Sequence, residues 1–303
     1  MTQMKLALGP HQYYWPRQAM MDFYGHVAES PVDIVYVGES VCSRRHEMRL
    51  DDWFDVARVL AEAGKEVVFS SLVLIESESD LKVLRKLVGQ PDFRVEANDM
   101  AAVQALIGAG HTHWVAGPTL NVFNPETMNV FAEQGATRWA VPPEMAREAM
   151  DGLLAASDPR PEVEVTAYGR LPLAYSARCF TARHFNLQKD TCEFRCLQHA
   201  EGMPLKTREG EAFLTLNGIQ TQSAKVYNLL GDLPALRASG VDVLRVLPQS
   251  EHMSELLSLF RRAIDGEIAP ADAFAQSQAL MPEAPCNGFW HGKPGLEQYV
   301  AAA

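Results

Sequence analysis

The sequence predicts an α/β fold of the (β/α)8 TIM-like barrel type, or a distorted form of it, from three observations. The chain of 303 residues is 47% hydrophobic and only 21% charged, which excludes a disordered chain and allows a large core. Short apolar segments alternate with amphipathic helical segments along most of the chain. Glycines stand between several of these helices and the next strand. About eight strand–helix units result, and eight such units close a barrel.

The predicted strands are short apolar segments, and their regular alternation with helices indicates a parallel sheet. In chain order they cover residues 5–8, 34–37, 66–69, 94–97, 113–116, 138–141, 162–166 and 242–246. Four of them follow Gly64, Gly110, Gly135 and Gly240. Glycine is favoured just after a helix because it adopts a left-handed conformation without a Cβ clash.

The predicted helices carry apolar residues at helical spacing. In residues 50–63, for example, Trp53, Val56 and Leu60 fall on one face. Residues 125–134, 143–155 and 250–265 show the same pattern. Proline is tolerated in the first turn of a helix, and both Pro125 and Pro143 stand at a predicted start.

One region departs from this alternation. From residue 168 to about residue 221 the pattern fades, and the segment contains three of the five cysteines. We interpret residues 1–303 as a single barrel-like domain, with 168–221 as an elaborated loop or insertion. The loops that follow barrel strands carry the chemistry of this fold, so the insertion is a candidate functional region.

The charge of the chain limits its partners. Lys and Arg number 27 and Asp and Glu 38, so the net charge is −11. A protein that binds nucleic acid or an anionic membrane over a broad surface normally has the opposite balance. No apolar segment has the length and continuity of a membrane span, and the N-terminus lacks the apolar core of a signal peptide. We therefore expect a cytoplasmic protein without structural disulfides.

Four cysteines are positioned to converge. Cys192 and Cys196 are four positions apart, and Cys179 precedes Cys192 by 13 positions. If residues 192–196 are helical, their two thiols share one face. Cys42 follows the predicted strand 34–37, which places it on the rim of the barrel where the insertion also lies.

Four thiolates suit either a [4Fe-4S] cluster or a structural zinc ion. Zinc sites usually draw on two closely spaced pairs, so the scattered spacing here favours a cluster. The simpler alternative is that the cysteines are small buried apolar side chains. Cys286 stands apart from the other four, and we expect no role for it in the site.

Basic residues accompany the four cysteines in a chain that is acidic overall. They are Arg44, Arg45, His46, Arg49, Arg178, Arg183, Lys189 and Arg195. Cations stabilise thiolates and an anionic cluster. They would equally suit an anionic substrate beside the metal, and the two roles are compatible.

Several segments resemble a known family. The segment Glu164 to Gly169 (EVTAYG), continued by Tyr175 to Cys179 (YSARC), is similar to the signature of the collagenase-like peptidase family, whose catalytic type is unknown. The C-terminal segment NGFWHGKPG, which begins at Asn287, resembles one branch of that family. The segments Leu8-Gly9-Pro10 and VGESVCSRR, which contains Cys42, also match this branch, and the resemblance covers nearly the whole chain.

This resemblance implies a specific function. Proteins of this branch form a heterodimer with a UbiU-like protein, and a lipid-carrier accessory protein of the same pathway is a further partner. Each subunit carries a [4Fe-4S] cluster, for which the matching ligands here are Cys42, Cys179, Cys192 and Cys196. The complex is a hydroxylase that acts on the aromatic ring of ubiquinone precursors in anaerobic ubiquinone biosynthesis, without molecular oxygen. The resemblance identifies no catalytic residue, and the activity is expected to require the partner.

The chain also departs from the broader family. Pro172 stands where peptidase-like members often have a cysteine, and Ala177 where they have a glycine. These departures do not favour peptidase activity. Two alternatives stay open: a protease or peptide-binding barrel with structural cysteines, and hydroxylation of RNA bases. The net charge of −11 argues against a large RNA footprint.

Polar residues at the predicted carboxyl ends of strands are candidates for the wall of a pocket. They are His11, Glu39, Asn98, Asp99, Asn121, Asn124 and Glu144. For each of them alone, a role in capping a helix or a loop is the simpler explanation.

Overall fold

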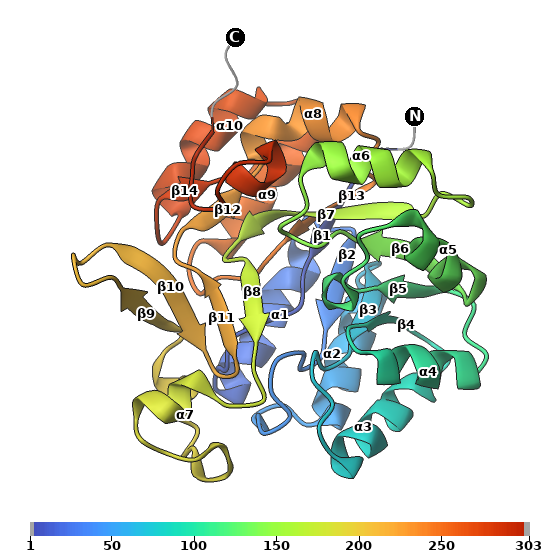
Figure 1. Ribbon diagram of the computed structural model, residues 1–303, viewed down its shortest axis with the longest axis vertical. Coiled ribbons are helices and arrows are strands. Elements are labelled where there is room, and N and C mark those ends of the chain that lie inside the picture. The colour runs from blue at the N-terminus through green and yellow to red at the C-terminus, as the bar shows by residue number, and fades with distance from the viewer. Residues whose placement is uncertain (1–2, 300–303) are drawn as a thin grey trace.

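The computed structural model describes residues 3–299 and contains a closed barrel of eight parallel strands (Figure 1). Each strand pairs with the next in parallel, and the last, β13, pairs with both β7 and β1. The barrel strands are β1 (Lys5–Leu8), β2 (Ile34–Val37), β3 (Glu66–Ser70), β4 (Arg94–Ala97), β5 (Trp114–Ala116), β6 (Ala136–Ala140), β7 (Glu162–Gly169) and β13 (Val243–Val246). The predicted (β/α)8 architecture is confirmed.

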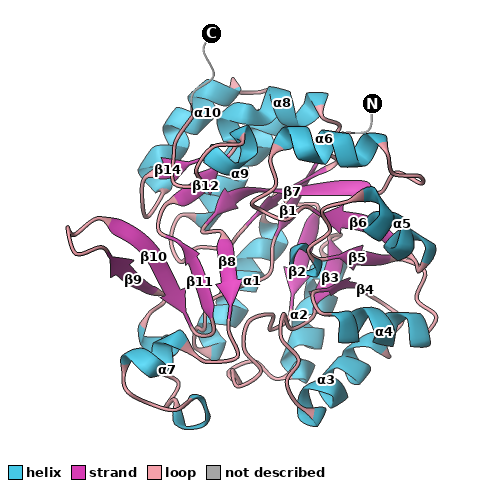
Figure 2. Ribbon diagram, in the orientation of Figure 1, coloured by secondary structure: helices cyan, strands magenta, loops and turns pink. Residues whose placement is uncertain are grey.

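Helices surround the barrel, as Figure 2 shows. They are α1 (Arg17–Glu29), α2 (Leu50–Glu62), α3 (Glu78–Val88), α4 (Met100–Gly108), α5 (Pro125–Glu133), α6 (Arg147–Ala155), α8 (Leu233–Ala238), α9 (Met253–Ile264) and α10 (Pro270–Ser277). Their apolar faces pack on the outside of the barrel; Trp53, Val56 and Leu60 of α2, for example, are buried there. Within residues 3–299, no helix has the length and apolar character needed to cross a membrane.

Two predicted helix starts are wrong, and the backbone explains both. The helix predicted for residues 143–155 begins only at Arg147, because the Met145 N–H bonds the Pro142 carbonyl in a turn. The helix predicted for 250–265 begins at Met253, because His252 adopts a left-handed conformation with φ of 58°. The other predicted helix and strand ends lie close to the observed ones.

The region predicted as an elaborated loop contains a small antiparallel sheet. Its strands are β8 (Pro172–Tyr175), β9 (Met203–Lys206), β10 (Ala212–Asn217) and β11 (Gln220–Ser223), in the order β8-β11-β10-β9. Between β8 and β9 lies the short helix α7 (Phe180–His184). Sheet and helix stand together beside the barrel, on the left of Figure 1. Two further strands, β12 (Val226–Asn228) and β14 (Pro285–Cys286), extend the barrel sheet beyond β7.

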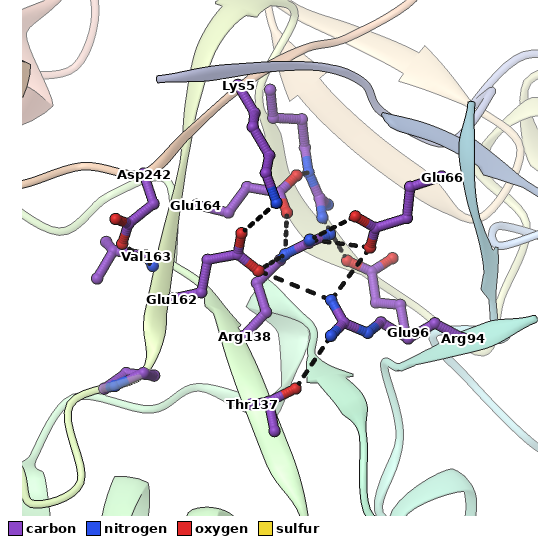
Figure 3. Close-up of polar contacts among 12 residues, drawn as sticks. Lys5, Glu66, Arg94, Glu96, Thr137, Arg138, Glu162, Val163, Glu164 and Asp242 are labelled. Atoms are coloured by element: carbon purple, nitrogen blue, oxygen red, sulfur yellow. Dashed lines mark hydrogen bonds and ion pairs between the residues drawn. The ribbon is translucent and has the colours of Figure 1, made fainter. Parts of the chain in front are cut away.

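Ion pairs fill much of the barrel interior, where other barrels of this type bury branched apolar side chains. Arg245 donates from Nε to Glu164 and from Nη2 to Glu96, both at 2.7 Å. Towards the amino ends of the strands, Arg138 donates to Glu162 at 2.7 Å and to Glu66 at 2.9 Å (Figure 3). Each arginine therefore holds carboxylates from two different strands, which links opposite parts of the barrel wall.

Candidate metal centre

The four predicted cysteines line a single small cavity of about 20 Å³. Cys42 comes from the loop between β2 and α2, and the other three come from the segment between β8 and β9. Cys42 is buried, and Cys179, Cys192 and Cys196 are half-buried. All four are free thiols. The fifth, Cys286, is buried elsewhere in β14.

The loop that carries Cys42 is shaped by Glu39. The Glu39 carboxylate accepts hydrogen bonds from the backbone N–H groups of Val41, at 2.9 Å, and Cys42, at 3.0 Å. Before it, Gly38 turns the chain out of β2 with φ of +107°, where a Cβ would lie 3.0 Å from the Ser70 carbonyl oxygen. This turn requires glycine, and it places Cys42 on the rim of the barrel.

Cys179 lies at the start of α7. Its sulfur accepts a hydrogen bond from the Ala182 N–H at 3.4 Å and so caps the helix. The turn between β10 and β11 holds this end of α7, because the Gly218 carbonyl accepts from Phe180 N–H at 2.8 Å. The Thr181 hydroxyl in turn accepts from the Gly218 N–H at 3.0 Å.

Cys192 and Cys196 do not share one helix, so the condition considered from the sequence for residues 192–196 is not met. Between them Glu193 and Phe194 both have φ of 52°, in the left-handed region. Cys192 ends one short 3-10 turn, Lys189–Thr191, and Cys196 lies in the next, Arg195–Gln198. The reversal between the two turns still directs both cysteines to the same cavity.

Basic side chains complete the wall of the cysteine cavity. Arg44, Arg45, Lys189 and Arg195 line it, and no carboxylate from residues 3–299 does. Each of these cations also pairs with an acidic side chain outside the cavity wall; the partners, in the same order, are Asp190, Glu39, Glu76 and Glu193. The Nε atoms of the three arginines are buried without a hydrogen-bond partner in the described part of the chain. A buried donor without a partner costs about 1–3 kcal/mol, and an anionic group within reach of these atoms would remove that cost.

Arg45 is the most deeply placed of these cations. Its Nη1 donates to the Gln12 carbonyl at 2.7 Å and its Nη2 donates to Asn217 Oδ1 at 2.8 Å. Burial raises the pKa of the Cys42 thiol to about 11, and burial also raises the pKa of Cys196. The positive charge of Arg45 opposes both rises.

The four cysteines share one cavity wall. Among residues 3–299, no three His, Cys, Asp or Glu side chains are grouped closely enough to bind one metal ion. The donor set itself, four cysteine thiols, is of the kind that holds either a [4Fe-4S] cluster or a zinc ion.

The other residues considered from the sequence divide into three groups. Asn98, Asn121 and Glu144 line a separate polar cavity of about 330 Å³ at the mouth of the barrel. His11 is buried against the ring of Trp15, and Glu39 shapes the Cys42 loop. Asp99 and Asn124 only cap helices: they accept from the backbone N–H groups of Ala101 and Thr127.

The charged floor of this barrel-mouth cavity was not predicted. Arg245 and Glu96 both line it, and they form an ion pair at 2.7 Å. A signal was present, because charged residues alternate with apolar ones at Arg94 and Glu96 in β4 and at Glu162 and Glu164 in β7, and Arg245 interrupts the apolar strand β13. In a barrel strand such an alternating position faces the interior.

Comparisons with known proteins concern both the sequence and the fold. Residues 21–297 match the family model described as peptidase family U32. The solved structure of the U32 peptidase Mk0906 is 14% identical, with a TM-score of 0.45 over 82% of this chain and 94% of that one. An N-acetylneuraminate lyase from Aliivibrio salmonicida is 10% identical, with a TM-score of 0.47 over 91% of this chain and 79% of that one. Because the family model spans most of the sequence, the chain belongs to peptidase family U32.

Proposed function

We propose that this U32 protein is the UbiV-like, iron–sulfur subunit of a heterodimer that hydroxylates the aromatic ring of ubiquinone precursors without molecular oxygen. The observation that carries the proposal is the cysteine cavity, where four cysteines meet four basic side chains and no carboxylate of residues 3–299. The resemblance of the C-terminal segment and of the Cys42 loop to this branch of the family supports the same function.

The cavity has the donors that a [4Fe-4S] cluster requires. Cys42, Cys179, Cys192 and Cys196 would hold the four irons as thiolates. The partnerless Nε–H groups of Arg44, Arg45 and Arg195 are available to donate to sulfur, and such hydrogen bonds tune the reduction potential of a cluster. When bound, the cluster would supply one-electron transfer to or from the reacting ring.

The rest of the chain positions this site. Arg44 ties the Cys42 loop to the segment before Cys192, since its Nη2 donates to the Asp190 carbonyl at 2.7 Å. Trp15 holds the segment that follows Cys196, because its Nε1 donates to the Ala200 carbonyl at 2.8 Å. The UbiU-like partner and the lipid-carrier accessory protein belong to the proposal through the family resemblance.

An anaerobic hydroxylation assay tests this function. An extract from cells that lack this chain supplies the oxygen donor and the partner, a prenylated phenol is added, and the product is measured by mass spectrometry. We expect hydroxylated product on addition of the wild-type chain and of Cys286→Ser. We expect none with Cys192→Ser.

Two results would contradict the proposal. One is hydroxylation that does not depend on the four cysteines. The other is peptide cleavage by the purified chain that survives the double replacement Cys192→Ser and Cys196→Ser, which would return the protein to the peptidase class.

A further inference from the structure

A second cavity adjoins the cysteine cavity and has Arg45 in common with it. It has a volume of about 350 Å³ and lies between the Cys42 loop, α2, the end of β3 and α3. In Figure 1, α2 and α3 lie next to each other at the lower right of the barrel. Nothing in the proposed role of the cysteines accounts for this α2–α3 cavity.

The long wall of the α2–α3 cavity is one face of α3. Ser79, Val83 and Leu87 line it at helical spacing, over eight residues of rise. At about 1.5 Å per residue this face is roughly 12 Å long. Opposite it stand Trp53 of α2 and Ile75 of the loop after β3, so most of the surface is apolar.

Polar and charged side chains of the Cys42 loop also line the α2–α3 cavity. They include Glu39, Arg45 and His46, while Ser79 and Asp80 add polar groups from α3. Val83 contributes an apolar side chain to the wall, and 49% of the surface of this residue is exposed. A largely apolar cavity that meets charged residues fits an amphipathic molecule with a hydrocarbon tail and one polar head.

We propose that the α2–α3 cavity binds the hydrocarbon tail of a prenylated phenol, with its ring at the Arg45 end beside the cysteine cavity. This inference rests on the proposed function, which requires such a substrate, and it assigns the substrate a site. Burial of the tail against Val83, Leu87 and Trp53 provides affinity, at about 25 cal/mol per Å² of apolar surface removed from water. His46, which lines the same cavity next to Arg45, offers a polar partner to the ring substituents.

Calorimetric titration of the full chain with 2-geranylphenol under anaerobic conditions tests the site. Val83→Trp and Ile75→Trp each place a large ring into the cavity from opposite sides. We expect each to weaken binding at least tenfold. Lys82→Trp is the matched control, because Lys82 is exposed on α3 next to Val83 but outside the cavity wall, and it should bind like the wild type. Thermal melting of each variant confirms that it is folded.

The outcomes separate this inference from the proposed function. A wild-type chain that holds iron but binds no geranylphenol, or that binds it equally well in both cavity variants, overturns the site alone. Binding that the cavity variants abolish, in a chain that takes up no iron, supports the site and overturns the proposed function. A linear alcohol with the same number of carbons, which has a neutral head but no ring, should bind at least tenfold more weakly, and equal affinity would overturn the placement of the ring at Arg45.

Discussion

At the residue scale, Arg45 links the cysteine cavity to the rest of the protein. Its side chain is only 2% exposed, and its guanidinium lies 3.6 Å from Glu39 and over the ring of Tyr14 at 5.6 Å. These contacts fix a positive charge beside Cys42 and Cys196, where it opposes the pKa rise that burial causes in both thiols. A lysine would not reproduce the arrangement, because the planar guanidinium donates to Gln12 and Asn217 at the same time.

His11 makes folding stability depend on pH. Its Nδ1 donates to the Tyr13 carbonyl at 3.1 Å, and burial lowers its pKa from 6.5 to about 3. Between these values the unfolded chain binds a proton that the folded chain does not, so stability falls as the pH falls. We expect the wild type to lose about 2 kcal/mol more than His11→Gln between pH 7 and pH 5. Urea denaturation at the two pH values measures this, and equal losses would contradict the assignment.

At the scale of elements, the glycines between helices and strands were the most informative signal. Gly64, Gly110, Gly135 and Gly240 all have positive φ, as expected for residues that end a helix. Strand and helix positions around them could therefore be predicted. The antiparallel sheet could not, because its strands are short and partly polar, and because β11 pairs with the distant strand β8 in a register that shifts between Thr221 and Gln222.

Two glycine replacements should have opposite effects. Gly152 lies exposed in the interior of α6 with open space around its Cα, so Gly152→Ala should stabilise the protein by about 0.5–1 kcal/mol. Gly288 belongs to the C-terminal family segment, and a Cβ there would lie 1.9 Å from the Pro294 carbonyl oxygen. Gly288→Ala should therefore cost about 2 kcal/mol. Chemical denaturation measures both, and a change of the same sign in the two variants would contradict the close packing described at Gly288 or the open space at Gly152.

The cysteine cavity could be predicted in part from the sequence. Cys42 could be placed because it follows a barrel strand, and the other three because they share one irregular segment. The reversal between Cys192 and Cys196 could not be predicted, because Glu193 and Phe194 adopt left-handed conformations that their residue types usually avoid. The partnerless arginine Nε atoms depend on side-chain packing from distant segments, which a single sequence does not show.

At the scale of the whole molecule, the barrel interior is held by ion pairs across its strands. Arg245 is buried between Glu96 and Glu164, and the Tyr36 hydroxyl also donates to Glu164. Buried ion pairs contribute little net stability compared with apolar packing, but removing one partner leaves an uncompensated charge. The floor of the barrel-mouth cavity therefore carries charged side chains whose ion pairs the fold has to keep intact.

Replacing Arg245 tests the role of these interior ion pairs. Arg245→Met leaves Glu96 and Glu164 buried without their cation and should cost about 3–5 kcal/mol in the free energy of unfolding. Adding Glu96→Gln and Glu164→Gln to the same chain should recover at least half of the loss. Urea denaturation measures both variants. A cost below about 1 kcal/mol for Arg245→Met would contradict the structural role.

The central claim is that four named cysteines hold one [4Fe-4S] cluster. The most direct measurement is the iron and acid-labile sulfide content per chain, determined after anaerobic purification for the wild type and for five single Cys→Ser variants. We expect nearly equal iron and sulfide in the wild type and in Cys286→Ser. We expect a large loss of both in the variants of Cys42, Cys179, Cys192 and Cys196. Zinc in place of iron, no metal at all, or iron that survives all four replacements would contradict the claim.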